Sequence, residues 1–441
     1  METSLIWIIT AALIIAVFVP YYLKFRQRQK SDKERKKDAV ARGVPLPRNQ
    51  YPLIDASRCI GVGSCVDACP EGDVLGVVYG KATIINGNRC VGHGFCELVC
   101  PVGALKVGLG DIKTRDDIPI LDENNQTNIK GLYIAGELAG FSLIRNAMVQ
   151  GRKVIERIAL DEYRSQDESL KDVIIVGCGP AGLSASLSAI RNRLSYLTID
   201  QQDPGGTILQ YPRRKLAMTQ PVEIPLYGWL NEPEYSKEFL LELWDEVIKA
   251  FDVKIITDQR VGNVKKCDDI FEVVTQGDRY KARNVVLAMG RRGTPRKIGA
   301  PGEHLPKVMY QLIDAQSYND VHILVVGGGD SAVEAAIGLA KQNGNVVSVS
   351  YRKNQFFRIK KKNDERVNEM IARKKIKTLF NSSVKEIREK LVLLQTEDGI
   401  IEIPNDYVFV FIGGIPPFES LKEMGIAFGG EVKEVVQGAS P

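Results

Sequence analysis

Two glycine-rich turns, each set between an apolar run and a run of small residues, constrain the fold of this 441-residue chain more than any other feature. The first lies within residues 172–200, which read DVIIVGCGPAGLSASLSAIRNRLSYLTID. A strand, a glycine loop, a helix, a second strand and a closing acid predict a parallel βαβ unit that binds a dinucleotide. The loop lets backbone N–H groups approach the pyrophosphate at the start of the helix, and the acid accepts the ribose hydroxyls. The predicted binding residues are Gly177, Gly179, Gly182 and Asp200.

A second copy of this pattern lies within residues 322–353, which read HILVVGGGDSAVEAAIGLAKQNGNVVSVSYRK. Its second strand ends in basic residues instead of an acid. Basic side chains at this place suit the 2′-phosphate of NADPH, so we favour NADPH over NADH; the alternative is a solvated basic loop. The predicted binding residues are Gly327, Gly329, Ala332, Arg352, Lys353 and Arg358.

Six of the eight cysteines lie between Cys59 and Cys100, in two segments that match each other. The segments read CIGVGSCVDACP and CVGHGFCELVCP, and each cysteine and proline recurs 31 residues later. A fixed offset at four positions indicates an internal duplication. Three disulfides would suit a small secreted domain, whereas the nucleotide motifs favour a reducing cytoplasm, where thiols bind metals.

The cysteine repeat resembles the bacterial two-cluster ferredoxins, whose half-motif is C-x2-C-x2-C-x3-C-P. The second cysteine of each half is replaced here, by Val62 and by His93. In that family the fourth cysteine of each half ligates the cluster of the other half. The resemblance therefore implies one ligand set of Cys59, Cys65 and Cys100, and another of Cys90, Cys96 and Cys69.

Three thiolates in each set leave the type of cluster open. A 3Fe–4S cluster is one option, and a 4Fe–4S cluster with a fourth ligand other than cysteine is another. His93 is the candidate ligand for the second set, whereas Val62 cannot coordinate, so the first site is 3Fe–4S, solvent-ligated or degenerate. The alternatives are a zinc site or an empty relic; zinc commonly takes C-x2-C pairs, and this sequence has none.

The two glycine units, in this order, resemble the thioredoxin-reductase-like flavoproteins. The resemblance implies FAD at the first unit and NADPH at a second, inserted unit. The apolar run 406–413 looks like the family's strand that re-enters the FAD domain. The family's C-x-x-C before the second glycine motif is missing, so only the separate Cys178 and Cys267 remain and no dithiol relay is available. Near the expected flavin the resemblance adds Gly205, Gly206 and Thr207.

The family's closing segment, T-N-x-x-G-L-x-x-A-G-D, is missing after Gly413 and is found upstream, within residues 117–158. Thr127 and Asn128 begin the match, and Gly136 and Glu137 end it, with glutamate in place of aspartate. We interpret this order as a circular permutation with a new joint at residues 161–171, since permutation is tolerated where termini lie close together at the surface. The alternative is an unrelated helix and strand.

Residues 5–23 contain no charged side chain, and about 19 residues just span a hydrocarbon core of roughly 30 Å. A basic run, 24–42, follows this segment, and only Glu2 precedes it. The positive-inside rule then places the rest of the chain in the cytoplasm, as a single-pass protein of the cell inner membrane. The alternatives are a cleaved signal peptide or a buried helix; a signal peptide carries positive charge before the apolar run and a small-residue cleavage site after it, and neither is present.

We therefore predict an α/β protein with two Rossmann-like dinucleotide-binding domains, preceded by a small α+β ferredoxin domain and one N-terminal transmembrane helix. The predicted parts are the helix 1–23, a basic, partly helical linker 24–50, a ferredoxin-type domain 51–110, the permuted segment 111–160, the FAD domain 171–295, the NAD(P)H domain 296–404 and a return to the FAD domain at 405–441.

These parts predict an oxidoreductase that moves electrons between NADPH, FAD and iron–sulfur clusters, and on to a protein or a quinone at the membrane. Hydride transfer to a flavin needs no protein acid or base, so we name no catalytic residue. Members of the resembled family often form homodimers, and the net charge of +5 without a basic face argues against nucleic acid. The alternatives are an NADPH-dependent disulfide reductase acting through Cys178 or Cys267, and a non-enzymatic redox sensor at the membrane.

Overall fold

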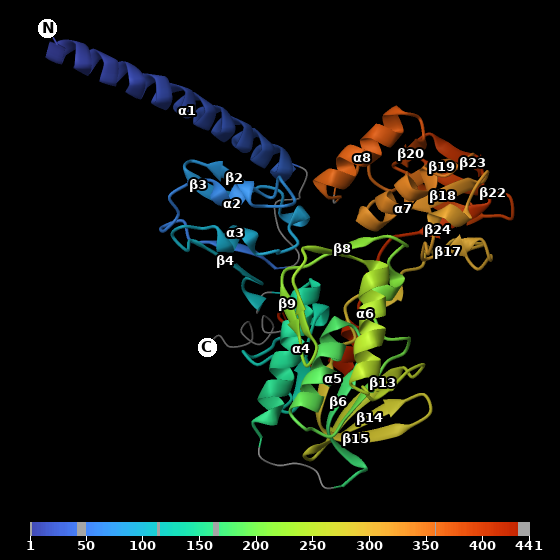
Figure 1. The fold of residues 1–441 in the computed structure, drawn as a ribbon. Coiled ribbons are helices and arrows are strands. Elements are labelled where there is room, and N and C mark those ends of the chain that lie inside the picture. The colour runs from blue at the N-terminus through green and yellow to red at the C-terminus, as the bar shows by residue number, and fades with distance from the viewer. Residues whose placement is uncertain (1, 42–49, 113–114, 162–166, 358, 431–441) are drawn as a thin grey trace, which may run out of the picture. The chain divides into compact units, whose positions relative to one another are not determined.

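The computed structural model describes residues 2–41, 50–112, 115–161, 167–357 and 359–430. The chain divides into two compact units (Figure 1). The first unit comprises residues 1–108 and 357–362, and the second comprises residues 109–356 and 363–441.

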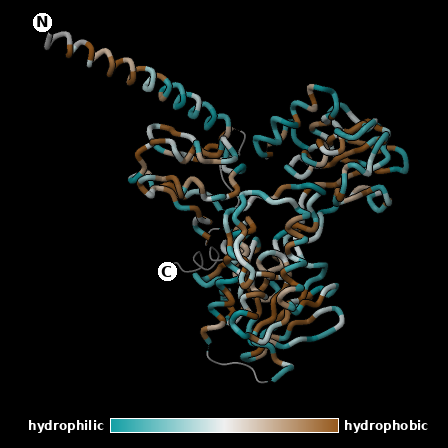
Figure 2. Tube along the Cα trace, viewed as in Figure 1, coloured by the Kyte–Doolittle hydropathy of each residue, from teal (hydrophilic) through white to brown (hydrophobic). Residues whose placement is uncertain are grey.

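Helix α1 (Glu2–Ala41) is a single 40-residue helix that contains Pro20. It continues through most of the basic segment that we predicted as a partly helical linker. Its N-terminal half is coloured mainly hydrophobic and its later half hydrophilic (Figure 2). An 18-residue window in this helix has a mean hydropathy of 1.5 and is 0% buried, so α1 is long and apolar enough to cross a membrane. The same length and composition also occur in signal sequences.

The rest of the first unit is a small α+β fold. Strand β1 (Tyr51–Ile54) pairs antiparallel with β4 (Leu105–Gly108), which joins the start of this fold to its end. Between them lie the hairpin of β2 (Leu75–Val78) and β3 (Lys81–Ile84), and the one-turn helices α2 (Ser64–Asp67) and α3 (Phe95–Leu98). The buried core of this fold includes Val74, Leu75, Val77 and Leu105 together with the cysteines.

The second unit contains a seven-stranded sheet in the order β12-β7-β6-β15-β14-β13, with β5 also paired to β15. Its parallel part comprises β5 (Leu132–Ile134), β6 (Leu170–Val176), β7 (Tyr196–Ile199) and β12 (Ile255–Ile256), next to β15 (Arg279–Leu287). Strands β13 (Val261–Cys267) and β14 (Ile270–Thr275) extend it in the antiparallel sense. Helix α5 (Pro180–Arg191) connects β6 to β7, so the predicted order of strand, glycine turn, helix and strand is present.

Two small antiparallel pairs and one helix lie between β7 and β12 in the sequence. The pairs are β8 (Leu216–Met218) with β11 (Glu234–Ser236), and β9 (Val222–Ile224) with β10 (Gly228–Leu230). Helix α6 (Lys237–Ala250) follows, and the side chain of Ser236 caps it by accepting a hydrogen bond from the Phe239 N–H. Trp244 of α6 is buried in a core that also contains Cys178.

Residues 117–158, which we interpret as a moved closing segment, fold as part of the seven-stranded sheet. Strand β5 pairs parallel with β15 in the register Leu132↔Val285, and α4 (Ile144–Ala159) packs closely on α5. The segment also meets the late part of the chain, where the Asn128 side chain donates to the Gly425 carbonyl and accepts from the Ala427 N–H, both at 2.9 Å. These contacts join residues 117–158 to the segment around Gly425, and a permutation would separate these two pieces in sequence.

A five-stranded parallel sheet in the order β17-β24-β18-β19-β20 carries the second glycine turn. Its strands are β17 (Val308–Met309), β18 (His322–Val326), β19 (Val346–Tyr351), β20 (Ile376–Phe380) and β24 (Tyr407–Val410), and its helices are α7 (Asp330–Ala340) and α8 (Lys361–Ala372). An antiparallel sheet of β21 (Ser383–Ile387), β22 (Leu391–Thr396) and β23 (Gly399–Pro404) adjoins it.

Strand β24 corrects one prediction. We expected residues 406–413 to re-enter the FAD domain, but β24 pairs with β17 and β18 and completes the second sheet. Its residues Val408 and Phe409 are fully buried, as expected for an inner strand of a parallel sheet. The chain returns only at β25 (Gly414–Ile415), which pairs antiparallel with β16 (Thr294–Pro295), and then forms α9 (Phe418–Glu423).

The packing of α4 on α5 depends on Gly151, because a Cβ atom there would lie 2.1 Å from the Ala181 carbonyl oxygen. We predict that Gly151→Ala lowers the free energy of unfolding by about 1–3 kcal/mol, as overpacking of a close helix contact does. Urea denaturation measures this change. Gly277→Ala is the control, because a Cβ there meets no atom within 4 Å. Equal stability of the two variants would contradict the prediction.

Candidate cofactor sites

The two halves of the cysteine repeat have nearly the same backbone. Gly61 and Gly92 have φ angles of 71° and 73°, and Gly63 and Gly94 have φ angles of 85° and 86°. These left-handed conformations favour glycine. Gly63 and Gly94 stand immediately before α2 and α3, so each cysteine loop turns into its short helix in the same way.

Electrostatic contacts link thiols of the two halves of the repeat, and the two crossed ligand sets that the ferredoxin resemblance implies stay a prediction. In the first set, burial raises the pKa of Cys65, and the neighbouring Cys59 and Cys100 raise it further. In the second set, burial raises the pKa of Cys96 to about 12, with further contributions from Cys90 and Cys69 and a smaller one from Cys65 of the first set. We call Cys59, Cys65 and Cys100 the first thiol set, and Cys69, Cys90 and Cys96 the second thiol set.

The second thiol set lines one cavity together with His93, where Pro52, Phe95 and Val107 supply apolar walls. Burial lowers the pKa of His93 to about 4, and the positive charge of Lys360 acts in the same direction. The imidazole is therefore neutral at pH 7, which is the state that can ligate a metal. At the corresponding place beside the first thiol set, Val62 is 58% exposed.

The surroundings of the thiols suit iron–sulfur clusters. The Ala82 N–H donates to the Cys59 sulfur at 3.3 Å and the Ala104 N–H donates to the Cys100 sulfur at 3.2 Å, and such donors stabilise clusters that carry negative charge. All eight cysteines are free thiols. Among the described residues, no three His, Cys, Asp or Glu side chains gather closely enough to hold a single metal ion.

The predicted flavin residues come together from three separate segments. The Gly205 N–H donates to the Cys178 carbonyl at 2.9 Å, which places the loop 205–207 against the first glycine turn. A Cβ on Gly206 would lie 3.0 Å from the Gly179 Cα, and a Cβ on Gly136 would lie 3.1 Å from the Ala181 Cβ. All three segments thus meet at the N-terminus of α5. This terminus begins with Pro180 and has no side-chain cap, so its N–H groups suit a pyrophosphate.

Asp200 holds the first glycine turn in addition to its predicted role. Its carboxylate accepts hydrogen bonds from the Cys178 N–H at 2.5 Å and from the Gln202 N–H at 2.9 Å. Burial raises the pKa of Asp200, and the same backbone donors act against that rise. A carboxylate has about four acceptor positions, so Asp200 can hold this loop and still accept from ribose hydroxyls.

Glu137 lies in a charged group that sequence analysis did not identify. Burial raises the pKa of Glu137, and the positive charges of Arg291 and Arg292 oppose the rise. Tyr211 belongs to the same group, because burial raises its pKa and Glu137 adds to that effect. Tyr211 lies four residues after the Gly205–Thr207 loop, and Arg292 lies two residues after Gly290. Their closeness in sequence to these glycines is the signal that could have identified Tyr211 and Arg292.

The second glycine turn is closely packed at Gly328 and open at Gly329. A Cβ on Gly328 would lie 2.3 Å from the Tyr351 ring, whereas a Cβ on Gly329 would meet no atom within 4 Å. Gly329 is the N-cap of α7, so an open glycine stands where a phosphate would approach the helix. Ala332 is fully buried. Arg352 and Lys353 are exposed just after β19, and Arg358 lies outside the described residues.

The sequence matches two families of known proteins. Residues 174–437 match the pyridine nucleotide-disulphide oxidoreductases, and residues 51–101 match the 4Fe-4S dicluster domain. The chain belongs to the pyridine nucleotide-disulphide oxidoreductase family. It is an FAD-dependent oxidoreductase of the thioredoxin reductase and ferredoxin–NADP reductase type, with a 4Fe–4S ferredoxin domain near its N-terminus. Both resemblances stated from the sequence are thereby confirmed.

Relatives with named activities support this assignment. The chain is 31% identical to a ferredoxin–NADP reductase of Ignicoccus hospitalis over 59% of its own length and 83% of the relative. It is 33% identical to a thioredoxin reductase of Bacillus subtilis over 58% of its own length and 79% of the relative. Among solved structures, the bacillithiol disulfide reductase Bdr of Staphylococcus aureus is 30% identical with a TM-score of 0.53, over 59% of this chain and 81% of that chain.

The role of Asp200 predicts a specific loss of flavin. Asp200→Ala removes the carboxylate that holds the Cys178 N–H and faces the expected ribose, so FAD should bind about 10–100-fold more weakly, as loss of a hydrogen-bonded charged group does. Flavin content per chain and titration with FAD measure the change. Asp203→Ala, at an exposed position of the same loop, should keep the wild-type affinity.

The second thiol set predicts a partial loss of iron. Cys96→Ser removes one thiolate from one of two sites, so we expect anaerobically purified protein to lose about half of its iron and acid-labile sulfide. Cys267→Ser, at the exposed end of β13, should leave both counts unchanged. An equal loss in the two variants would contradict the assignment of the set.

Proposed function

We propose that this protein passes electrons from NADPH through FAD to the two thiol-bound clusters, and from there to an acceptor at a membrane. The observation that carries the proposal is the distribution of cysteines. Six of the eight form the two thiol sets, and they are fused to a reductase whose Cys178 is 0% exposed and whose Cys267 lies at the exposed end of β13. The clusters would therefore supply the route by which electrons leave the flavin.

The chain's own residues position the cofactors. The segments around Gly136, Gly179 and Gly206 would hold FAD at the start of α5, while Gly329 with Arg352 and Lys353 would hold NADPH at the start of α7. When bound, a flavin accepts a hydride and releases electrons singly, which clusters accept one at a time. The N–H groups of Ala82 and Ala104 favour the charged state of the cluster sulfurs. His93 would be the fourth ligand of the second site.

The circular permutation is part of this proposal. The matched relatives align over about four fifths of their lengths, which leaves room for a closing segment outside the collinear match. Strand β5, which pairs with β15, and helix α4, which packs on α5, precede the first glycine turn in sequence and would supply the missing strand and helix. The order of the chain then puts the ferredoxin domain directly before Gly136 and Glu137, which belong to the flavin site.

Helix α1 would anchor the protein in the inner membrane, with everything after Lys24 in the cytoplasm. Its apolar window supports a span, and the basic residues that follow it support the orientation. The acceptor is then a protein or a lipid-soluble molecule of that membrane. The basic residues after β19 suit the 2′-phosphate that NADPH and NADP⁺ share, and the same chain of cofactors would also carry electrons in the reverse direction.

A disulfide reductase is the rival function, because the chain is 28% identical to the bacilliredoxin reductase Bdr of Bacillus subtilis. A cysteine that attacks an external disulfide must reach it as a thiolate. Cys178 is fully buried, and burial raises the pKa of its thiol far above the usual range, with Asp200 adding to the effect. The double variant Cys178→Ser/Cys267→Ser would abolish such an activity and leave an electron relay intact.

Stopped-flow absorbance tests the relay directly. On anaerobic mixing with NADPH, we expect the flavin band to bleach first and the cluster band to follow, because the flavin is the group that accepts hydride. EPR of samples frozen during the reaction identifies the reduced clusters. Flavin reduction with clusters that stay oxidised would overturn the proposal.

The basic residues after β19 predict the choice of nucleotide. Arg352→Ala/Lys353→Ala should weaken binding of NADPH about tenfold or more and leave NADH nearly unaffected, because only NADPH carries the 2′-phosphate. Steady-state KM values for both nucleotides measure this difference. Lys341→Ala, which removes an exposed lysine after α7, is the control.

A further inference from the structure

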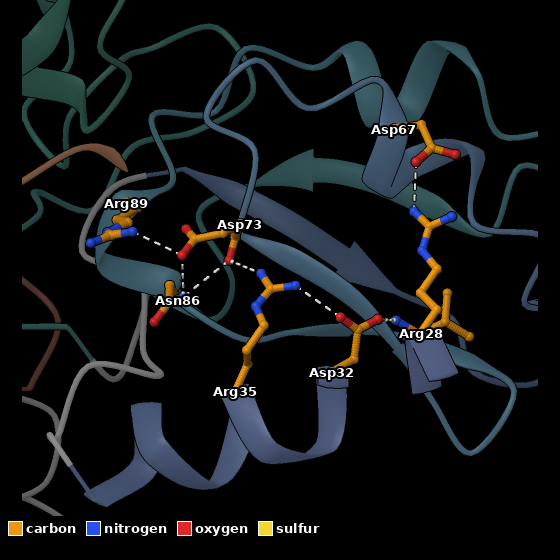
Figure 3. Close-up of polar contacts among 8 residues, drawn as sticks. Arg28, Asp32, Arg35, Asp67, Asp73, Asn86 and Arg89 are labelled. Carbon is orange, nitrogen blue, oxygen red and sulfur yellow. Dashed lines mark hydrogen bonds and ion pairs between the residues drawn. The ribbon is translucent and has the colours of Figure 1, made fainter. Parts of the chain in front are cut away.

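Helix α1 is joined to the rest of the first unit by buried polar contacts (Figure 3). Asp32 is 3% exposed; its carboxylate accepts from the Val77 N–H at 2.8 Å and from the Arg35 guanidinium at 2.8 Å. Arg35 also donates to the Asp73 carbonyl at 3.1 Å. A Cβ on Gly76 would lie 2.8 Å from the Asp32 carboxyl carbon, so a glycine is needed for this approach. Removal of such a buried, hydrogen-bonded charge would loosen the helix from the fold.

Helix α1 also holds the first thiol set close to the end of the helix's own apolar run, residues 5–23. Arg28 donates to Asp67 of α2 at 2.5 Å, and its guanidinium lies 3.8 Å from the position of a Cβ on Gly63. Arg28 follows Leu23, the end of the uncharged run 5–23, by five positions, which is roughly 7–8 Å of helix. The headgroup layer on one side of a bilayer is about 5–7 Å thick. If α1 spans a bilayer along its normal, the loop between Cys59 and Cys65 would lie at the level where the headgroup layer ends.

Exposed apolar side chains gather around this loop. Ile60 is 65% exposed, Leu98 is 73% exposed and Tyr79 is 79% exposed. The loop touches the β2–β3 turn, since a Cβ on Gly61 would lie 2.0 Å from the Gly80 carbonyl oxygen, and the Ser64 hydroxyl beside it donates to the Val99 carbonyl at 3.2 Å. We define the apolar rim as these exposed residues next to the first thiol set: Ile60, Val62, Tyr79, Leu98, Val99 and Val102.

We propose that the apolar rim docks on the headgroup layer of the bilayer that α1 spans, and that electrons leave the first thiol set there for a quinone-type molecule dissolved in the lipid. This inference rests on the proposed function for the supply of electrons. Large exposed apolar groups clustered on a soluble surface mark an interaction site. The amino group of Lys33 lies 4.0 Å from the centre of the Tyr79 ring, so a positive charge stands beside an aromatic side chain, a combination that suits a lipid interface.

The reaction balances without a further reactant. NADPH gives two electrons and one proton as it becomes NADP⁺. The quinone takes up these two electrons, one at a time through the cluster, together with two protons, of which one comes from the solvent. The sum is NADPH, H⁺ and quinone giving NADP⁺ and quinol.

The docking step is tested without any redox reaction. Full-length Ile60→Trp protein is placed in phosphatidylcholine nanodiscs with plain or brominated acyl chains, and its tryptophan emission is compared in the two. Ile400→Trp is the matched control, because Ile400 is a half-exposed isoleucine of β23 in the other unit. We expect the brominated lipid to quench the emission added at position 60 and to spare that added at position 400. Equal quenching, or none at position 60, would overturn the docking, whatever the fate of the proposed relay.

The electron exit is tested with two acceptors, a short-chain benzoquinone dissolved in the nanodisc and water-soluble ferricyanide. Ile60→Gln/Leu98→Gln should lower quinone reduction by about tenfold and leave ferricyanide reduction unchanged, since uncharged substitutions remove apolar contact with lipid. Asp32→Ala should do the same by freeing the helix, and Glu34→Ala, at an exposed acid of α1, should not. Unchanged quinone reduction in the rim variant overturns the exit. Failure of NADPH to reduce either acceptor in the unmodified protein instead overturns the proposed function.

Discussion

The pairing of β15 with two parallel neighbours is the constraint on which the flavin site depends. Val285 is opposite Leu132 of β5 on one side and opposite Ile174 of β6 on the other, and Leu287 in turn is opposite Ile134 and Val176. Both neighbours therefore end at the same level of the sheet. The turns that follow them carry Gly136 and Gly177, so two segments that are distant in sequence deliver their glycines to one edge. Ligands of open α/β sheets bind at this carboxyl edge.

Much of this arrangement could be predicted from the sequence, because glycine loops and cysteine spacing act locally. The strand–glycine–helix order specifies the turn at Gly177, the offset of the cysteines indicates a duplication, and the ferredoxin resemblance implies which thiols cross between halves. The position of β24 could not be predicted in this way, because an apolar parallel strand carries no mark of which sheet it joins; the register with β18 decides it. The group around Glu137 was missed for a similar reason, since Tyr211 and Arg292 approach it only through the tertiary fold.

In the first unit, the burial of the cysteine thiols opposes their ionisation. Burial raises the pKa of Cys90 to about 11 and that of Cys96 to about 12, and the nearby thiols add to the effect. Without metal, these groups are held as neutral thiols at pH 7, since several thiolates in one small core would repel one another. Metal ions need the thiolate form and offset that repulsion, so cluster binding and folding of this unit are coupled. The buried contacts of Asp32 attach α1 to this fold, whose stability we expect to depend on bound clusters.

The cysteines also explain why the chain joins these two units. A thioredoxin-type reductase passes two electrons together through a dithiol, whereas here Cys178 is buried beneath the glycine turn and serves as packing. Its backbone holds Asp200 and Gly205, so the position that carries sulfur contributes structure to the nucleotide loop. In the proposed relay electrons would leave the flavin singly, and clusters accept them one at a time. In that relay the ferredoxin unit would take the place of the dithiol, and the buried contacts of Asp32 would hold this unit on α1.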